Sequence, residues 1–178
     1  MYPVIRLLWQ VFKYRKAPKF APLDTHVSRH ICLPWDIDLW MELNNGRTLT
    51  LYDLGRIPMA YRAGLVQALK TNRWGLTMAG ASVRYRRRIR MFETVEMRTR
   101  VVWWDDKFIY IEQSMWKSDG DCANHIVYRS AVTGERGIVP PSEVMEVLKL
   151  KIDRPKAPTW VAAWIKADHA RPWPPMQE

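Results

Sequence analysis

The sequence has few cysteines, no long apolar run and no internal repeat, and each absence removes a class of protein. Its 178 residues include only 2 cysteines, Cys32 and Cys122, and no Cys-x-x-Cys pair or cysteine–histidine cluster. Neither a disulfide framework nor a zinc site is expected, so a reducing compartment, the cytoplasm, is the default location.

No apolar run reaches the ~18–20 residues of a membrane-spanning helix. Residues 1–12 are apolar but lack a preceding basic stretch and a cleavage site, so we expect no signal peptide.

The composition is that of one globular domain with a strong positive charge. Hydrophobic residues make up 48% of the chain, which is enough for a core, and its 10 tryptophans are many for this length. A net charge of +10 favours anionic partners such as nucleic acid, a membrane surface or a phosphate-bearing small molecule. Since the sequence contains no recognition-helix or RNA-binding aromatic motif, we do not expect nucleic acid to be the partner.

Residues 1–24 form a distinct N-terminal arm in which apolar residues are followed by basic ones, with Pro18 and Pro22 at its exit. The apolar residues are Tyr2, Val4, Ile5, Leu7, Leu8, Trp9, Val11 and Phe12, and the basic ones are Lys13, Arg15, Lys16 and Lys19. This pattern fits an amphipathic basic helix on an anionic bilayer, which would make the protein peripheral to a membrane. It also fits a helix that packs on its own domain or on a partner subunit, as short apolar helices commonly do.

A long helix is expected over residues 46–70, with Asn44 or Asn45 as its N-cap. Its apolar residues fall on nearly every side, so more than one neighbour must bury it. Pro58 is expected to kink or divide the helix, and Gly64 to end its main part.

Strand patterns account for much of the remaining chain. Alternating or β-rich runs occupy residues 25–33, 81–91, 93–104, 108–116 and 122–132. Short polar connections join the last three, which predicts an antiparallel meander. A sheet of this kind, curled around the helix, would bury the helix on most sides and predicts an α+β domain over residues 25–150. The tail, residues 151–178, is expected to pack back on the domain through Trp160, Trp164 and Trp173.

Residues 36–45, Asp-Ile-Asp-Leu-Trp-Met-Glu-Leu-Asn-Asn, resemble the Asp-x-Asp-x-x-Gly-His-Val-Asn-Asn signature of hot-dog proteins similar to 4-hydroxybenzoyl-CoA thioesterase. Asp53 and Arg56 stand where that family carries an acid and an arginine on the following helix, and residues 82–102 resemble its second and third strands. The likeness covers roughly residues 25–135 and is closest to the thioesterase-superfamily-member branch. It implies a hot-dog fold, an antiparallel sheet wrapped around a long central helix, and hydrolysis of an acyl thioester, such as an acyl-CoA, without a cofactor.

The resemblance also implies where the chemistry takes place. The second aspartate of the signature, Asp38, would attack the thioester carbonyl or activate a water molecule. The amide N–H groups of Asn45 and Gly46, at the helix N-terminus, would stabilise the developing oxyanion. Without the wider pattern, Asp38 would be interpreted as a loop aspartate that bonds local amides. Asp36 is expected to bond backbone in the same loop rather than to hold a metal ion.

Met41 and Glu42 replace the Gly-His pair of the signature, which shapes the loop before the helix. This departure keeps open a second function, a hot-dog module that binds acyl-CoA or a membrane surface without hydrolysis. Asp53 is an alternative carboxylate, because it follows Gly46 at the seven-residue spacing of hot-dog proteins that resemble phenylacetyl-CoA thioesterases. The same residue also suits an i,i+3 ion pair with Arg56.

An arginine-rich run offers a dense cationic surface for the phosphates of CoA, although such a run can also be a solvated face. Its members are Arg84, Arg86, Arg87, Arg88 and Arg90. His30 and His125 lie on expected strands with no paired serine or cysteine motif, so a serine–histidine mechanism is not expected. Because hot-dog domains usually pair, the resemblance implies a homodimer or homotetramer with the active site between subunits.

Overall fold

The computed structural model of the protein describes residues 2–18, 20–21 and 23–176. Lys19 and Pro22 of the expected arm lie outside the described residues, as do residues 1 and 177–178. The helices are α1 (Val4–Tyr14), α2 (Asn45–Arg62), α3 (Leu65–Asn72), α4 (Pro141–Val147) and α5 (Thr159–His169), and a short 3-10 helix spans Pro34–Asp36. The strands are β1 (His26–Ile31), β2 (Gly75–Tyr85), β3 (Thr94–Trp104), β4 (Ile109–Trp116), β5 (Cys122–Gly134) and β6 (Gly137–Val139).

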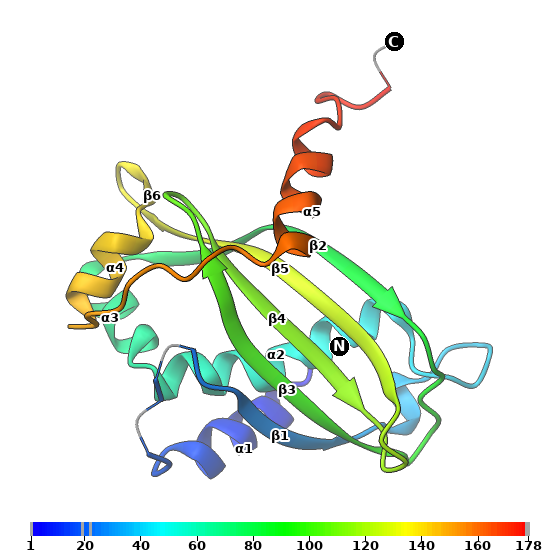
Figure 1. Cartoon of the computed structure of the whole chain (residues 1–178). Helices are drawn as coiled ribbons and strands as arrows, with labels where there is room; N and C mark the ends of the chain where they lie inside the picture. Colours follow the sequence, from blue (N-terminus) through cyan, green and yellow to red (C-terminus); the bar gives the residue numbers. More distant parts are fainter. Residues whose placement is uncertain (1, 19, 22, 177–178) are drawn as a thin grey trace.

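One antiparallel sheet forms the body of the protein and curls around α2 (Figure 1). Its strands lie in the order β1–β3–β4–β5–β2, with β6 paired to β5, so β1 and β2 are the two edges. Hairpins join β3, β4 and β5, which confirms the expected meander. The register places Thr99 opposite Gln113, and Gln113 opposite Ile126. This row of side chains lies beneath the helix.

α2 approaches the sheet closely at Gly55. A Cβ atom at this position would lie only 2.6 Å from Met97 Sδ and 2.7 Å from Thr99 Oγ1. Gln113 Nε2 donates hydrogen bonds to the carbonyl oxygen of Tyr52, at 2.9 Å, and to Thr99 Oγ1, at 2.8 Å. The helix is therefore fixed to the sheet by a buried polar contact as well as by apolar packing.

The helix expected over residues 46–70 is divided into α2 and α3 at Gly64. Gly64 has a φ angle of 78°, a left-handed conformation that glycine adopts without a Cβ clash, and it separates the two helices. Pro58 lies inside α2 and does not divide it. Its side chain is buried, and this burial helps to offset the stability lost with the backbone hydrogen bond that proline cannot donate.

The strand expected over residues 81–91 begins and ends earlier, because β2 spans Gly75–Tyr85. Its partner β5 begins at residue 122, so little of that strand is left to pair beyond the end of β2. The amides of Arg86 and Arg87 both donate to the carbonyl oxygen of Ala123, at 2.8 and 3.0 Å, where the chain leaves the sheet. The arginine run therefore lies mostly in a loop.

α1 lies at the periphery of the molecule, beside β1 and α2 (Figure 1). The hydroxyl of Tyr14 donates to the carbonyl oxygen of Val27 at 3.0 Å, and its ring packs edge-on against His26 with 4.6 Å between centroids. The arm thus contacts its own domain, which is one of the arrangements that the sequence allowed. Within the described residues, no helix is both long enough and apolar enough to cross a bilayer.

α5 begins on the outer face of the sheet and then leads away from it (Figure 1). The ring of Trp164 packs against Tyr110 with 6.1 Å between centroids, and Trp160 packs against His125 at 5.5 Å. Trp173 is 86% exposed, so the expectation that this tryptophan packs back on the domain is wrong. It lies beyond the end of α5, where the chain has left the sheet surface.

Substituting Gly55→Ala should lower the free energy of unfolding by about 1–3 kcal/mol, because the new methyl group would overlap Met97 and Thr99. Urea denaturation measures this change. Gly46→Ala in the same helix is the matched control, since its methyl group would approach only Asn44 Oδ1, at 3.4 Å. Alanine normally stabilises a helix relative to glycine, so equal stability of the Gly55→Ala and parent proteins would contradict the close approach.

Candidate active site

The first turn of α2 presents open backbone donors at one end of the sheet. Asn44 caps the helix: its side-chain oxygen accepts from the amide of Arg47 at 2.9 Å, and its carbonyl oxygen accepts from the amide of Thr48 at 2.8 Å. Asn45 and Gly46 are the first two residues of the helix, ahead of any intrahelical acceptor for their N–H groups. The positive end of the helix dipole lies at the same place, so the turn favours a negatively charged oxygen.

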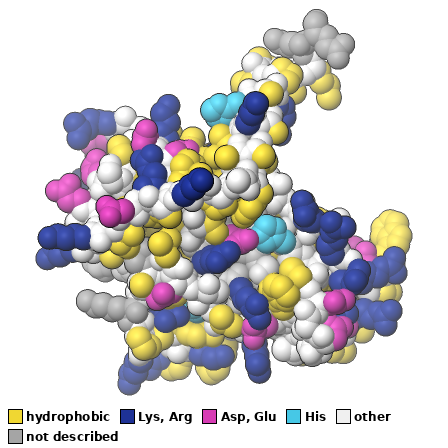
Figure 2. All heavy atoms as spheres, in the orientation of Figure 1, with side chains coloured by type: hydrophobic (Ala, Val, Ile, Leu, Met, Phe, Trp, Pro, Cys, Tyr) yellow, Lys and Arg dark blue, Asp and Glu magenta, His cyan; other side chains and the backbone are white. Residues whose placement is uncertain are grey.

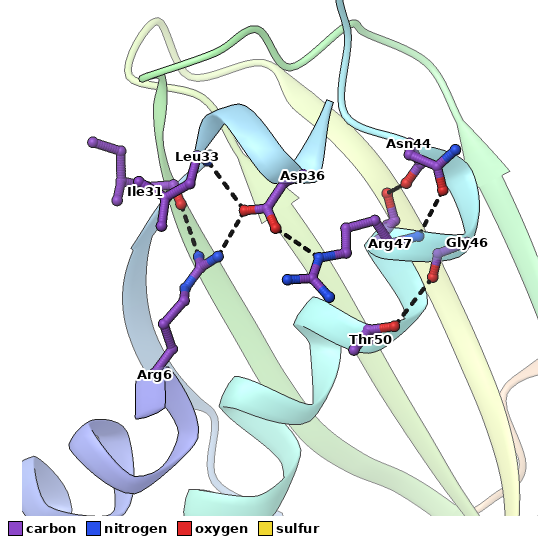
Figure 3. A network of polar contacts seen from close by, with 9 residues as sticks. Arg6, Ile31, Leu33, Asp36, Asn44, Gly46, Arg47 and Thr50 are labelled. Atoms are coloured by element: carbon purple, nitrogen blue, oxygen red, sulfur yellow. Dashed lines mark hydrogen bonds and ion pairs between the residues drawn. The ribbon is translucent and has the colours of Figure 1, made fainter. Parts of the chain in front are cut away.

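Asp36 is fully buried and connects the arm, the loop and α2 (Figure 3). Its carboxylate accepts from Arg6 Nη1 and from Arg47 Nε, both at 2.6 Å, and from the amide of Leu33 at 3.1 Å. Burial favours the neutral acid, but the hydrogen bonds from Arg47, Leu33 and Arg6 outweigh it and hold the pKa of Asp36 below its ordinary value. Asp36 is a structural anion with its acceptor sites occupied.

Asp38 lies in the tight loop that follows and is half-buried. Its carboxylate accepts from the amide of Trp40 at 2.9 Å, and its own amide donates to the carbonyl oxygen of Glu42 at 2.9 Å. Across residues 2–18, 20–21 and 23–176, no arginine, lysine or histidine forms an ion pair with Asp38. The loop tip beside it is open to solvent, with Leu39 91% exposed.

Met41, which stands in the place of the family's glycine, adopts a left-handed backbone conformation. Its φ angle is 60°, in the left-handed region that costs a residue with a Cβ about 1–2 kcal/mol. The backbone of this loop is therefore strained at Met41. Glu42, in the place of the family's histidine, points toward Arg88 and forms an ion pair with its Nε at 2.8 Å.

A small cavity of about 180 Å³ adjoins the first turn of α2 on one side. It is lined by Glu42, Leu43, Asn45, Thr48, Tyr85, Arg86, Arg87, Arg88, Ile89 and Asn124. The hydroxyl of Tyr85 donates to the carbonyl oxygen of Asn45 at 3.1 Å and so connects the end of β2 to the helix. Basic side chains gather at this end of the molecule (Figure 2).

The expected CoA-binding arginines do not all belong to this cavity. Arg86, Arg87 and Arg88 line it, whereas Arg84 on β2 and Arg90 beyond the cavity do not. Arg87 is already paired through Nε with Asp121, at 2.7 Å. Arg86 is exposed, and no ion pair joins it to another of the described residues, whereas Arg88 is paired with Glu42.

A larger groove of about 1080 Å³ adjoins the same turn on its other side. Most of its lining is apolar and comes from the start of the arm and from the loop before α2. The lining residues are Tyr2, Pro3, Val4, Ile5, Arg6, Trp35, Ile37, Asn44, Arg47 and Thr50. The first turn of α2 thus separates a cationic cavity from an apolar groove.

Asp53, the alternative carboxylate, lies farther along α2 and is already engaged. It forms an ion pair with Arg56, and its second oxygen accepts from the hydroxyl of Tyr2 at 2.9 Å. The guanidinium of Arg56 also lies over the ring of Tyr128, 4.2 Å from the centroid. These contacts agree with the i,i+3 interpretation of Asp53.

β1 carries a serine–histidine contact that was not predicted from the sequence. Ser28 Oγ lies 2.8 Å from His30 Nε2, on the inner face of the strand. Burial, with the nearby charges of Arg6 and Lys13 and the neighbouring His26, lowers the pKa of His30 to about 3, so its imidazole is neutral. Both side chains are buried, so this pair is part of the core rather than a second catalytic centre. Alternation along the strand, which places positions 28 and 30 on one face, was the available signal.

Substituting Met41→Gly should raise the free energy of unfolding by about 0.5–1 kcal/mol. Glycine removes the strain of the left-handed conformation, and its greater conformational entropy in the unfolded chain cancels only part of that gain. Thermal or urea denaturation measures this change in stability. Trp40→Gly, at an exposed neighbour without a positive φ, is the control and should destabilise instead. Destabilisation of both variants to the same extent would argue against strain at Met41.

Comparison with known proteins places the chain in a family. The profile of the thioesterase-like superfamily matches residues 32–165. Protein THEM6 of Xenopus laevis is 37% identical over 145 residues, which cover 81% of this chain and 69% of that protein.

Solved structures share the fold at low sequence identity. A 1,4-dihydroxy-2-naphthoyl-CoA thioesterase from Synechocystis superposes with a TM-score of 0.62 at 10% identity, covering 74% of this chain and 100% of the other. A Staphylococcus aureus protein solved in complex with CoA superposes with a TM-score of 0.63 at 11% identity, covering 77% and 93% of the two chains. The expected hot-dog fold is confirmed, and the chain belongs to the thioesterase-like superfamily.

Proposed function

We propose that this protein hydrolyses the thioester of an acyl-CoA at the first turn of α2. One observation carries the proposal: the open amides of Asn45 and Gly46 lie between an arginine-lined cavity and an apolar groove. An acyl-CoA has the matching parts in the matching order, an anionic phosphate portion, a thioester and an apolar acyl chain. The thioester oxygen would accept from the amides of the turn, where the helix dipole also stabilises an oxyanion.

Asp38 is the carboxylate that we assign to the reaction. Asp36 has its acceptors occupied by two arginines, and Glu42 and Asp53 are each paired with one arginine. Among the described contacts, Asp38 accepts only from a peptide N–H group, so its charge is not neutralised by a neighbouring cation. A carboxylate in this state is the better nucleophile or base of the group.

Two routes are compatible with this assignment. In one, an oxygen of Asp38 bonds to the carbonyl carbon and the C–S bond breaks, which releases CoA thiolate and leaves an anhydride that water opens. In the other, the carboxylate takes a proton from the attacking water, and CoA thiolate leaves from the tetrahedral intermediate. Both develop negative charge on the carbonyl oxygen, beside the amides of Asn45 and Gly46.

A second copy of the chain is expected to complete the site. β2 is an edge strand whose backbone groups are open to pairing, and most of its side chains are exposed. The neighbouring loop tip, with Leu39 and Trp40, is also exposed. Pairing of two β2 edges would join the sheets of a homodimer, which could pair again into a homotetramer, and would cover the open loop around Asp38.

Substituting Asp38→Asn should lower kcat/KM at least ~100-fold, as expected for the loss of a catalytic base or nucleophile. Release of free CoA from medium- and long-chain acyl-CoA measures the rate. Glu42→Gln and Asp53→Asn are the matched controls and should retain most of the activity. If Asp38→Asn stayed active and one of the controls lost most of its kcat/KM, the catalytic role would belong to the carboxylate changed in that control.

Substituting Arg86→Gln should raise KM for an acyl-CoA about fivefold or more, because a charge-assisted contact to phosphate is lost. KM for the corresponding acyl-pantetheine, which has no phosphate, should stay unchanged. Arg84→Gln, on β2 outside the cavity lining, is the control. An equal rise of KM with both thioesters would show that Arg86 acts on something other than the phosphates.

A non-catalytic acyl-CoA-binding module is the alternative function. The replacement of the family's Gly-His pair by Met41 and Glu42 favours it, as does the hydrogen bond that holds the Asp38 carboxylate against its own loop. The two functions differ in a simple measurement. Binding of acyl-CoA without any release of CoA, across thioesters of different length and aromaticity, would support the module and contradict hydrolysis.

A further inference from the structure

α1 is oriented with its polar residues toward the domain. Arg6 reaches Asp36 and also donates to the carbonyl oxygen of Ile31 at 2.8 Å, and Gln10 is buried. Tyr14 continues this stripe through its hydrogen bond to Val27. These contacts fix the rotation of the helix about its axis, so the direction of its other face is set by the fold.

The outer face of α1 is apolar and lies open. Ile5 is 85% exposed, and the exposed fractions of Leu8, Trp9 and Phe12 are 63%, 61% and 54%. The rings of Trp9 and Phe12 stack with 5.9 Å between centroids. These side chains follow one another at i, i+3, i+4 and i+7, so they form one continuous stripe along the helix. Globular helices normally bury such a stripe, and no part of the chain that the structure describes covers this one.

The charge around this face is of one sign. The first 23 residues contain no aspartate or glutamate, and Lys13, Arg15 and Lys16 follow the apolar stripe. The Arg15 guanidinium lies over the Phe12 ring, 3.5 Å from its centroid. A second copy seated on the stripe would bring a second set of cations, and its first 23 residues hold no acidic residue to pair with them. An anionic lipid surface supplies the opposite charge.

We propose that the outer face of α1 binds the surface of an anionic phospholipid bilayer. The helix has 11 residues and is therefore about 16 Å long, so it lies in the plane of the interface rather than across the membrane. Ile5, Leu8, Trp9 and Phe12 enter the boundary between headgroups and acyl chains, where aromatic rings are favoured. Lys13, Arg15 and Lys16 contact the lipid phosphates and carboxylates at the headgroup level.

This orientation would also bring the apolar groove near the lipid. Val4 and Ile5 belong to α1 and line the groove beside the first turn of α2, together with Trp35. Docking of the arm therefore directs the groove toward the bilayer surface. The interaction itself requires no hydrolysis, so it can be tested independently of the proposed enzymatic activity.

Co-sedimentation of the full chain with vesicles tests the proposal. The parent protein should bind vesicles made of equal parts phosphatidylserine and phosphatidylcholine more tightly than vesicles of phosphatidylcholine alone. The double substitution Leu8→Ser/Trp9→Ser keeps every charge and should weaken partitioning at least ~10-fold. Lys13→Gln/Lys16→Gln should weaken binding to the anionic vesicles about 30-fold, since each cation near the surface contributes about 1 kcal/mol.

Trp173→Ser is the matched control, because it removes an 86% exposed tryptophan from outside the arm. It should bind like the parent, and unchanged thermal denaturation should show that all variants are folded. Failure of the parent to sediment with anionic vesicles would overturn the proposal, as would undiminished binding of Leu8→Ser/Trp9→Ser. Conversion of an oligomer to a monomer by Leu8→Ser/Trp9→Ser, seen by light scattering, would assign the face to a second copy instead.

Discussion

The close contact between α2 and the curled sheet is the constraint on which the rest of the structure depends. Gly55 lets the helix backbone approach Met97 and Thr99, and Gln113 fixes the height of the helix by bonding the carbonyl oxygen of Tyr52. With the helix held in this way, its first turn emerges at one end of the sheet, where the amides of Asn45 and Gly46 have no acceptor within the helix. The loop before the helix and the end of β2 lie at that same end, so buried packing fixes the place of the proposed site.

The acids around this turn are distinguished by their cationic neighbours. Asp36 is buried between two guanidinium groups, whereas Glu42 and Asp53 are each balanced by one. Among the residues that the structure describes, Asp38 is held by a peptide amide and by no cation. Four carboxylates within a short stretch of chain thus experience different electrostatic environments. The arginines that produce this difference come from the arm, from α2 and from the loop after β2.

Local sequence patterns predicted most helices and strands, because these elements depend on the spacing of apolar residues. The end of α2 was also predictable, because glycine, as at Gly64, adopts a left-handed backbone easily. The sequence also located the start of α2 and the loop with Asp36 and Asp38. What it could not predict depends on contacts between distant segments. Arg6 reaching Asp36, Tyr2 reaching Asp53 and the division of the arginine run between cavity and surface all require the packed fold. The exposure of Trp173 likewise follows from the direction of α5.

The buried carboxylate of Asp36 has a consequence for the order of folding. Its partners lie 30 residues before it and 11 residues after it in the chain, so two loops of different length must close before the charge is neutralised. Closing the longer loop costs more conformational entropy. The anion would be solvated until both guanidinium groups arrive, which predicts that the sheet and α2 assemble first. The loop that contains Asp38 should then reach its final shape late, when the arm docks.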